Sequence, residues 1–205
     1  MSCVRSWDLA LYEVPIVHFG SCDIPLPLTP YPPRCIVNIV LIGYRGTGKS
    51  TVGRQLAARL GRALVSTDTE IVKRAQRTIP EIVGQDGWES FRDLESEICR
   101  ELAGRDQIVI DTGGGAILRQ QNVEALKKNG TVFWLTASVE TIVKRIGGDN
   151  QRPSLTGTKS FVDEIQDVLQ ERTPKYQAAA DHIIVTDGQS INPGFTTLHR
   201  IPSLA

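Results

Sequence analysis

A glycine-rich stretch that follows an apolar run carries the strongest chemical signal in this sequence. Residues 43–50 read GYRGTGKS, which matches the pattern GxxxxGK[ST] in full. Glycines allow backbone N–H groups to turn toward phosphate oxygens, and the start of the following helix adds the positive end of its dipole. Lys49 supplies a cation for the β- and γ-phosphates, and the Ser50 hydroxyl is a suitable Mg²⁺ ligand. The predicted residues of this nucleoside triphosphate site are Gly43, Gly46, Thr47, Gly48, Lys49, Ser50 and Thr51.

A phosphate loop does not by itself distinguish a kinase from a GTPase or an ATP-driven motor. The sequence contains no NKxD-type motif for reading a guanine base. The chain is also short enough for a single sheet without a second domain, which favours a kinase that acts on a small molecule.

Five further motifs follow the phosphate loop and suit the binding of a small anionic molecule. They are Asp68 after the apolar run at residues 63–65, FRDLE at residues 91–95, Gly113–Gly115 after the apolar run at residues 108–110, the pair Arg152 and Pro153 in a polar loop, and RTPKY at residues 172–176. In this order and at these spacings, together with the phosphate loop, they resemble the shikimate kinase family. The resemblance extends from about Val37 to the C-terminus.

The resemblance implies a role for each residue around the substrate. Asp68 would bind the hydroxyls of shikimate and accept the proton of its 3-hydroxyl. Arg92 and Arg172 would hold the carboxylate, with the backbone of Gly113–Gly115 lining the same pocket and Glu95 orienting Arg92. The residue types suit such a substrate independently, because guanidinium groups bind carboxylates in a bidentate manner.

The resemblance also implies residues around the nucleotide. Arg145 and Pro193 match positions that sandwich adenine, and Arg152 would move onto the transferring phosphate from a mobile lid at about residues 147–159. The implied reaction is ATP-dependent phosphorylation of the 3-hydroxyl of shikimate in aromatic amino-acid biosynthesis, with Mg²⁺ as cofactor. Such a transfer depends on positioning and charge stabilisation, and lid closure excludes water. The implied catalytic residues are Lys49, Asp68 and Arg152.

One position departs from the family pattern. The family usually carries two aspartates, D-x-D, after the second strand, whereas residues 66–68 read Ser-Thr-Asp. The missing aspartate normally helps to hold the water shell of Mg²⁺. The third strand ends in Asp111, where the family more often shows serine, and an apolar strand closed by a carboxylate has the form of a Walker B strand. We hypothesise that Ser66 and Asp111 have exchanged roles, which makes Ser50 and Asp111 the predicted metal ligands.

Other interpretations stay open at the level of sequence. Asp68 could cap a helix, as could either of the two residues before it, and Gly113–Gly115 could form a helix-entry turn. Kinases of gluconate or of a nucleoside monophosphate also have a phosphate loop, but they lack Arg92, the three glycines and Arg172 in this order. A catalytically silent nucleotide-binding regulator is a third possibility, which only the Ser66 departure favours.

The elements that must position these residues alternate along the chain. The expected strands are Ile36–Ile42, Ala63–Val65, Ile108–Ile110, Val132–Leu135 and Ile183–Val185. The expected helices include Ser50–Leu60, Ser90–Leu102, Ala116–Lys128 and Phe161–Ala178. This alternation predicts an α/β, three-layer α/β/α fold with a five-stranded parallel sheet, and the resemblance implies the nucleoside monophosphate kinase-like type. Ligands of such folds bind at the carboxyl ends of the strands.

Composition limits the partners and the compartment. The 205 residues carry 23 basic and 23 acidic side chains, so the formal net charge is +0, which argues against nucleic acid or an anionic membrane as the main partner. No stretch approaches the ~20 apolar residues that span a bilayer. We expect a cytoplasmic protein with ATP and shikimate as partners, and the resemblance implies a monomer. The cysteines, expected to be reduced thiols, are Cys3, Cys22, Cys35 and Cys99.

Residues 1–35 differ from the rest of the chain. They hold six of the eleven prolines and show no helical or strand period. Acidic residues and prolines interrupt the apolar stretch that a secretory signal needs. We expect a disordered or loosely attached extension, with residues 36–205 forming the kinase domain.

Overall fold

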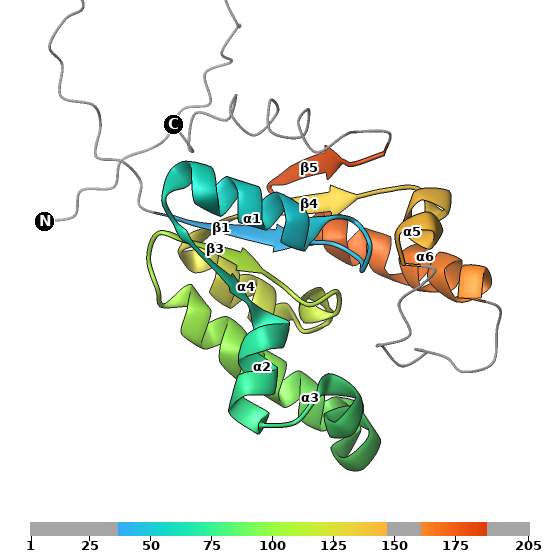
Figure 1. Ribbon diagram of the computed structural model, residues 1–205, viewed down its shortest axis with the longest axis horizontal. Coiled ribbons are helices and arrows are strands. Elements are labelled where there is room, and N and C mark those ends of the chain that lie inside the picture. Colours follow the sequence, from blue (N-terminus) through green and yellow to red (C-terminus); the bar gives the residue numbers. More distant parts are fainter. Residues whose placement is uncertain (1–36, 147–160, 188–205) are drawn as a thin grey trace, which may run out of the picture. The chain divides into compact units, whose positions relative to one another are not determined.

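The computed structural model describes residues 37–146 and 161–187, which form a parallel sheet with helices on both of its faces (Figure 1). The strands are β1 (Asn38–Ile42), β2 (Ala63–Ser66), β3 (Ile108–Asp111), β4 (Gly130–Thr136) and β5 (His182–Val185). The helices are α1 (Lys49–Leu60), α2 (Thr67–Ala75), α3 (Ile79–Ala103), the short 3₁₀ helix η1 (Ala116–Leu118), α4 (Gln120–Lys128), α5 (Val139–Ile146) and α6 (Phe161–Ala179). The expected extension (1–35) and lid (147–159) lie outside the described residues.

The sheet has the strand order β2-β3-β1-β4-β5, and every neighbouring pair is parallel. Leu41 in β1 is the register partner of Asp111 in β3, and Asp111 is in turn the partner of Ser66 in β2. The carboxyl ends of these three strands therefore lie next to one another along one edge of the sheet. The predicted five-stranded parallel sheet of a three-layer fold is confirmed.

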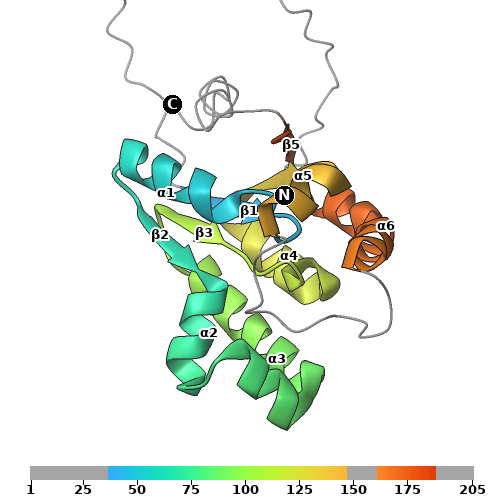
Figure 2. The same ribbon diagram turned by 45° about the vertical axis from the view of Figure 1, so that its right-hand side comes forward.

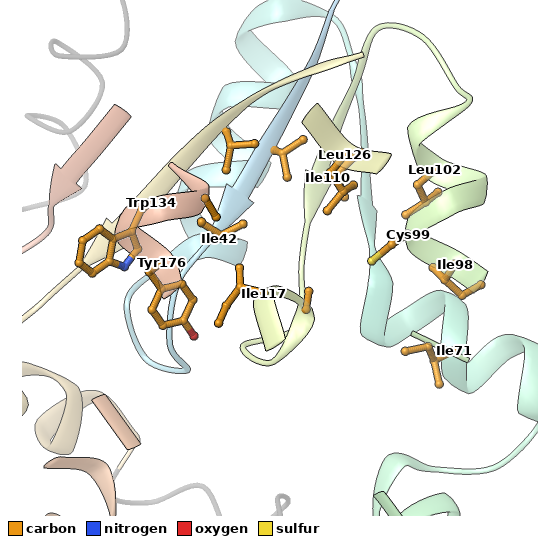
Figure 3. Packing of buried hydrophobic residues seen from close by; sticks show 14 of the residues in the cluster. Ile42, Ile71, Ile98, Cys99, Leu102, Ile110, Ile117, Leu126, Trp134 and Tyr176 are labelled. Carbon is orange, nitrogen blue, oxygen red and sulfur yellow. The ribbon is translucent and has the colours of Figure 1, made fainter. Parts of the chain in front are cut away.

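Side chains of the central strand alternate between two cores. Ile39 and Leu41 pack with Leu56 of α1 on one face of the sheet. Val40 and Ile42 point to the other face, where α3, α4 and α6 cover the sheet (Figure 3). Full burial of such an aliphatic side chain stabilises the fold by about 1.5–3 kcal/mol, so both cores hold the strand ends in place.

Helix α3 begins earlier than the expected Ser90, because a capping box starts it at Ile79. The Thr78 hydroxyl accepts the N–H of Glu81 at 3.4 Å, and the Glu81 carboxylate accepts the N–H of Thr78 at 2.7 Å. Gly87, with φ 83° and ψ 170°, interrupts the helix part-way. Figure 2 shows α2 beside α3, on the side of the sheet away from α1, and the ion pairs of α2 go to the last turns of α3.

The expected helix over Ala116–Lys128 is wrong as a single element. It consists of η1 and α4, separated by Arg119 in an extended conformation with φ −105° and ψ 117°. The guanidinium of Arg119 pairs with Asp93 at 2.6 Å and with Glu89 at 2.8 Å, both on α3. These distant partners leave no trace in local periodicity. The strands and the other helices expected from sequence begin or end within two residues of the observed positions, α3 excepted.

Two further expectations concern the described part of the chain. None of its helices is long and apolar enough to cross a bilayer. Cys99 is a buried free thiol in the core between the sheet and helices α3, α4 and α6, and burial raises its pKa well above the ordinary value. Cys3, Cys22 and Cys35 lie outside the described residues.

Alanine substitutions at two glycines of α3, Gly84 and Gly87, test whether the break in this helix requires glycine. Gly87→Ala should lower the free energy of unfolding by about 1–3 kcal/mol, because essentially only glycine adopts these backbone angles without strain. Gly84→Ala, at a helical position of the same helix, should raise it by about 0.5–1 kcal/mol. A Cβ at either glycine meets no described atom within 4 Å, so neither change adds a clash. Urea unfolding followed by circular dichroism measures both; equal stability of the two variants would contradict the prediction.

Candidate active site

The phosphate loop connects β1 to α1 and wraps around its own lysine. Lys49 is buried and donates from Nζ to the carbonyls of Gly43 at 2.9 Å and Tyr44 at 3.0 Å. Gly43 has φ 142°, and a Cβ there would lie 2.3 Å from the carbonyl oxygen of Leu135 in β4, so this position requires glycine. Gly48 caps α1 with no side-chain hydrogen bond, which leaves the first N–H groups of the helix for an anion.

Arg145, which was predicted to contact adenine, extends from α5 to the phosphate loop. Its Nη1 donates to the carbonyl of Gly46 at 3.1 Å and to the hydroxyl of Thr186 at 3.0 Å, and its Nη2 donates to the carbonyl of Thr186 at 2.7 Å. The Thr186 hydroxyl also bonds to the carbonyl of Thr47 at 3.1 Å. Arg145 and the residue after β5 therefore fix the loop from one side.

A pocket open to solvent, with about 550 Å³ of empty space, lies beside the start of the loop. It brings together residues from the first, second and third strand ends, from α3 and from α6. All six residues predicted to bind the substrate line it: Asp68, Arg92, Gly113, Gly114, Gly115 and Arg172. The pocket therefore combines two guanidinium groups, a carboxylate and a glycine turn next to a phosphate-binding loop.

The carboxylate of Glu95 is fully buried and pairs with Arg92, as predicted. Burial raises the pKa of this carboxyl above its ordinary value, and the adjacent Arg92 guanidinium offsets only part of the effect. The second oxygen, Oε1, is buried and has no hydrogen-bond partner in the described part of the chain. Arg92 is thus fixed by a buried carboxylate, while its guanidinium borders the pocket.

The glycine turn touches the charged side chains directly. A Cβ on Gly113 would lie 2.7 Å from Oδ1 of Asp68 and 2.8 Å from Oε1 of Glu95. A Cβ on Gly115 would lie 2.2 Å from Nη2 of Arg92. These charged side chains pack directly against the backbone of Gly113 and Gly115. A larger residue at either position would have to displace the charged side chains.

Asp68 lies in the first turn of α2 and is not the cap of that helix. The N-cap is Ser66, whose hydroxyl accepts the N–H of Thr69 at 3.5 Å. Asp111 is buried at the end of β3, and its neighbours in the sheet are Ser66 on one side and Leu41, just before the phosphate loop, on the other. The proposed exchange of roles thus concerns two directly adjacent strand positions.

Comparison with known proteins agrees with this geometry. A family model described as shikimate kinase matches residues 45–200. A shikimate kinase of Nitratidesulfovibrio vulgaris is 43% identical over 155 residues, which cover 74% of this chain and 88% of that protein. A shikimate kinase of Syntrophus aciditrophicus is 45% identical over 160 residues, covering 73% of this chain and 82% of the relative. This chain belongs to the shikimate kinase family.

A solved structure supports the same assignment. The shikimate kinase from Acinetobacter baumannii in complex with shikimate superposes with a TM-score of 0.76 at 36% identity, covering 81% of this chain and 93% of that one. The prediction of an ATP-binding shikimate kinase of the shikimate pathway is therefore confirmed at the level of the family.

Several lining residues of this shikimate kinase pocket were not predicted: Tyr44, Arg45, Ile79 and Trp88. Tyr44 and Arg45 occupy variable positions of the phosphate-loop motif, which carry no signal in a single sequence. Arg45 lies 3.6 Å from the buried carboxylate of Glu164 in α6. Trp88, interpreted from sequence as a packing residue, packs edge-on against Phe91, with the ring centres 5.8 Å apart. It also faces the pocket.

Two predicted site residues, Arg152 and Pro193, lie outside the described part of the chain. Ser50 and Thr51, by contrast, lie in the first turn of α1, directly after Lys49. The described residues therefore include every predicted contact to shikimate and most of those to the nucleotide.

Glu95→Gln measures the cost of the buried carboxylate. At about pH 4, below the ordinary carboxyl pKa, Glu95 is largely protonated in both folded and unfolded chains, so the variant and the wild type differ least there. As the pH rises, the unfolded carboxyl ionises before the folded one, and the wild type loses stability relative to the variant until the folded pKa is passed. The free energy of unfolding of the variant minus that of the wild type should therefore increase between about pH 4 and about pH 7.

Chemical unfolding over this pH range checks the prediction, with Glu97→Gln as the control. Glu97 lies on the same helix and its side chain is exposed. The free energy of unfolding of Glu97→Gln minus that of the wild type should therefore vary much less with pH. A difference for Glu95→Gln that stays flat or falls with pH would contradict the raised pKa.

Proposed function

We propose that the chain transfers the γ-phosphoryl group of ATP to the 3-hydroxyl of shikimate, giving shikimate 3-phosphate and ADP. The observation that carries this proposal is the pocket beside the phosphate loop, lined by Asp68, Arg92 and Arg172. Its charges complement a carboxylate at one end of a small molecule and hydroxyls at the other. The complex of the A. baumannii relative with shikimate supports the choice of substrate.

The two arginines are the proposed carboxylate ligands. Arg92 borders the pocket and is held from behind by Glu95. Nη1 of Arg172 donates to the carbonyl of Gly114 at 3.3 Å, whereas its Nε is buried and has no partner among the described residues. A donor that is buried but unpaired is costly, and a ligand carboxylate in the pocket is the acceptor that satisfies it.

Asp68 is the proposed base. It lines the pocket at the start of α2, where the 3-hydroxyl of shikimate would approach the phosphate loop. In this proposal its carboxylate accepts the hydroxyl proton as the oxygen attacks the γ-phosphorus. General-base catalysis of this kind contributes about 10²–10⁴-fold to a rate.

Lys49, Arg145, Arg152 and Pro193 are the proposed nucleotide contacts around the loop. Lys49 exchanges its bonds to the Gly43 and Tyr44 carbonyls for phosphate oxygens when ATP binds. The contribution of Arg152 from the lid, and the adenine contacts of Arg145 and Pro193, rest on the family resemblance. A monomer is likewise proposed from the family resemblance, whereas residues 1–35 are proposed as an extension of the kinase domain (36–205) because of their prolines and missing periodicity. A cytoplasmic location is proposed as well.

The residues at the strand ends fit a magnesium ion held mainly by the nucleotide. Mg²⁺ in kinases is bound by one or two carboxylates together with substrate phosphates. The described residues contain no cluster of three or more acidic, histidine or cysteine ligands, which accords with such a sparse site. Ser50, after Lys49, and Asp111, beside the strand that leads into the loop, are the proposed ligands. When bound, the ion neutralises charge that develops on the transferring phosphoryl group.

A coupled ADP-release assay tests the substrate. With ATP and Mg²⁺, ADP release should depend on shikimate and should not occur with gluconate or AMP. Asp68→Asn should lower kcat by about 10²–10⁴-fold, because the proposed base is lost. Asp93→Asn, on the exposed side of α3, is the control and should keep the wild-type rate. Release with gluconate or AMP, or with none of the three, would contradict the proposal.

Asp111→Asn tests the metal ligand. The free Mg²⁺ concentration that gives half-maximal rate should rise at least about ten-fold, because the proposed carboxylate ligand is lost. Adding Ser66→Asp to this variant should restore part of the affinity, since the two positions are register partners. Binding of Mn²⁺ to the ADP complex, followed by electron paramagnetic resonance, gives a readout independent of turnover. An unchanged metal dependence in Asp111→Asn would rule out the exchange of roles.

A further inference from the structure

We propose that Thr67 and Tyr176 are positioning residues for shikimate, because their hydroxyls hold the glycine turn (Gly113–Gly115) from two sides. Neither side chain lines the pocket, so neither would contact the substrate. This inference rests on the proposed function, since it assigns a role at the same site.

Thr67 holds the first residue of the turn. It is completely buried, and its hydroxyl accepts the N–H of Gly113 at 2.8 Å. Thr67 is also the residue directly before Asp68 at the start of α2. This hydrogen bond therefore ties the turn to the backbone that carries the proposed base.

Tyr176 holds the second residue of the turn from α6. Its hydroxyl donates to the carbonyl of Gly114 at 2.5 Å, and Nη1 of Arg172, one helical turn earlier, donates to the same oxygen at 3.3 Å. The Tyr176 ring is buried and stacks on Trp134 of β4, with ring centres 5.7 Å apart and planes at 12° (Figure 3). The sheet thus fixes the ring, and the ring fixes the hydroxyl that holds the turn.

The remaining carbonyls of the turn bond within the chain. Gly113 accepts the N–H of Ala116 at 3.2 Å, and Gly115 accepts that of Leu118 at 2.9 Å. Within the described part of the chain, the N–H groups of Gly114 and Gly115 have no acceptor, although both residues line the pocket. A turn held in this way presents two backbone donors to an oxygen of the substrate.

The position of the turn also determines the position of the charged side chains. Gly113 is packed against Asp68 and Glu95, and Gly115 is packed against Arg92, with no room for a Cβ at either glycine. A turn that shifts by a few tenths of an ångström moves these side chains or opens gaps beside them. Loss of either hydroxyl should therefore weaken shikimate binding without a comparable effect on ATP.

The test compares Thr67→Val, Thr67→Ser and Tyr176→Phe with the wild-type chain. Each variant is titrated with shikimate in a calorimeter, and the KM values for shikimate and ATP are measured in the ADP-release assay. Thr67→Val and Tyr176→Phe should each raise the Kd and KM for shikimate about 3- to 10-fold, as expected for one lost hydrogen bond. Their KM for ATP should change less than about two-fold, and Thr67→Ser, which keeps the hydroxyl, should stay close to the wild type.

Thr112→Val is the matched control for a buried threonine. The Thr112 hydroxyl donates to the carbonyl of Leu41 at 2.9 Å, and this carbonyl also accepts the N–H of Thr112 at 3.1 Å, so it keeps a donor in the variant. Thr112→Val should leave the Kd for shikimate unchanged even if it lowers the thermal midpoint.

The possible failures are distinguishable. If the wild-type chain binds no shikimate, both the proposed function and this inference are overturned. If the wild type binds shikimate and both hydroxyl-lacking variants bind it equally well, only the role of the two hydroxyls is overturned. An equal rise in KM for ATP and for shikimate would likewise overturn it, because the effect would then be general. If Thr67→Val does not fold, Tyr176→Phe decides the matter alone.

Discussion

Parallel pairing of β1 with β3 brings the phosphate loop and the glycine turn side by side. The carbonyl of Leu41 accepts the backbone N–H of Thr112 at 3.1 Å, and this backbone pairing sets the level at which the two strands end. The phosphate loop leaves β1 at that level, and the glycine turn leaves β3 beside it. A slip of one residue would exchange the two faces of a strand, so burial on both faces enforces the register.

Two carboxylates behind the pocket, those of Glu95 and Glu164, are buried. Glu95 with Arg92, and Glu164 with Arg45, are ion pairs in which the carboxylate is buried and the guanidinium faces the pocket. Burial of an ion pair contributes little to stability, because desolvation offsets the attraction. These pairs are therefore better understood as supports that hold two guanidinium groups at a small pocket.

Glycine serves two different purposes in this fold. In the phosphate loop, positive φ values at Gly43, Gly46 and Gly48 shape the backbone around a lysine. In the turn after β3, Gly113 and Gly115 are needed because charged side chains lie against the backbone. The first use is visible in a motif, because its spacing is characteristic. The second becomes intelligible only when the neighbours of each glycine are known.

Periodicity and motif spacing are local properties, so the sequence was enough to predict the alternation of strands and helices, the phosphate loop and the chemical character of the pocket. Three features became visible only in the folded chain: Thr67 and Tyr176 hold the same turn, Arg45 and Trp88 face the pocket, and Arg119 separates two helices and pairs with α3. The physical reason is that these contacts join residues far apart along the chain. Hydrogen bonds and packing across such separations arise when the sheet aligns its strand ends, and no local pattern records them.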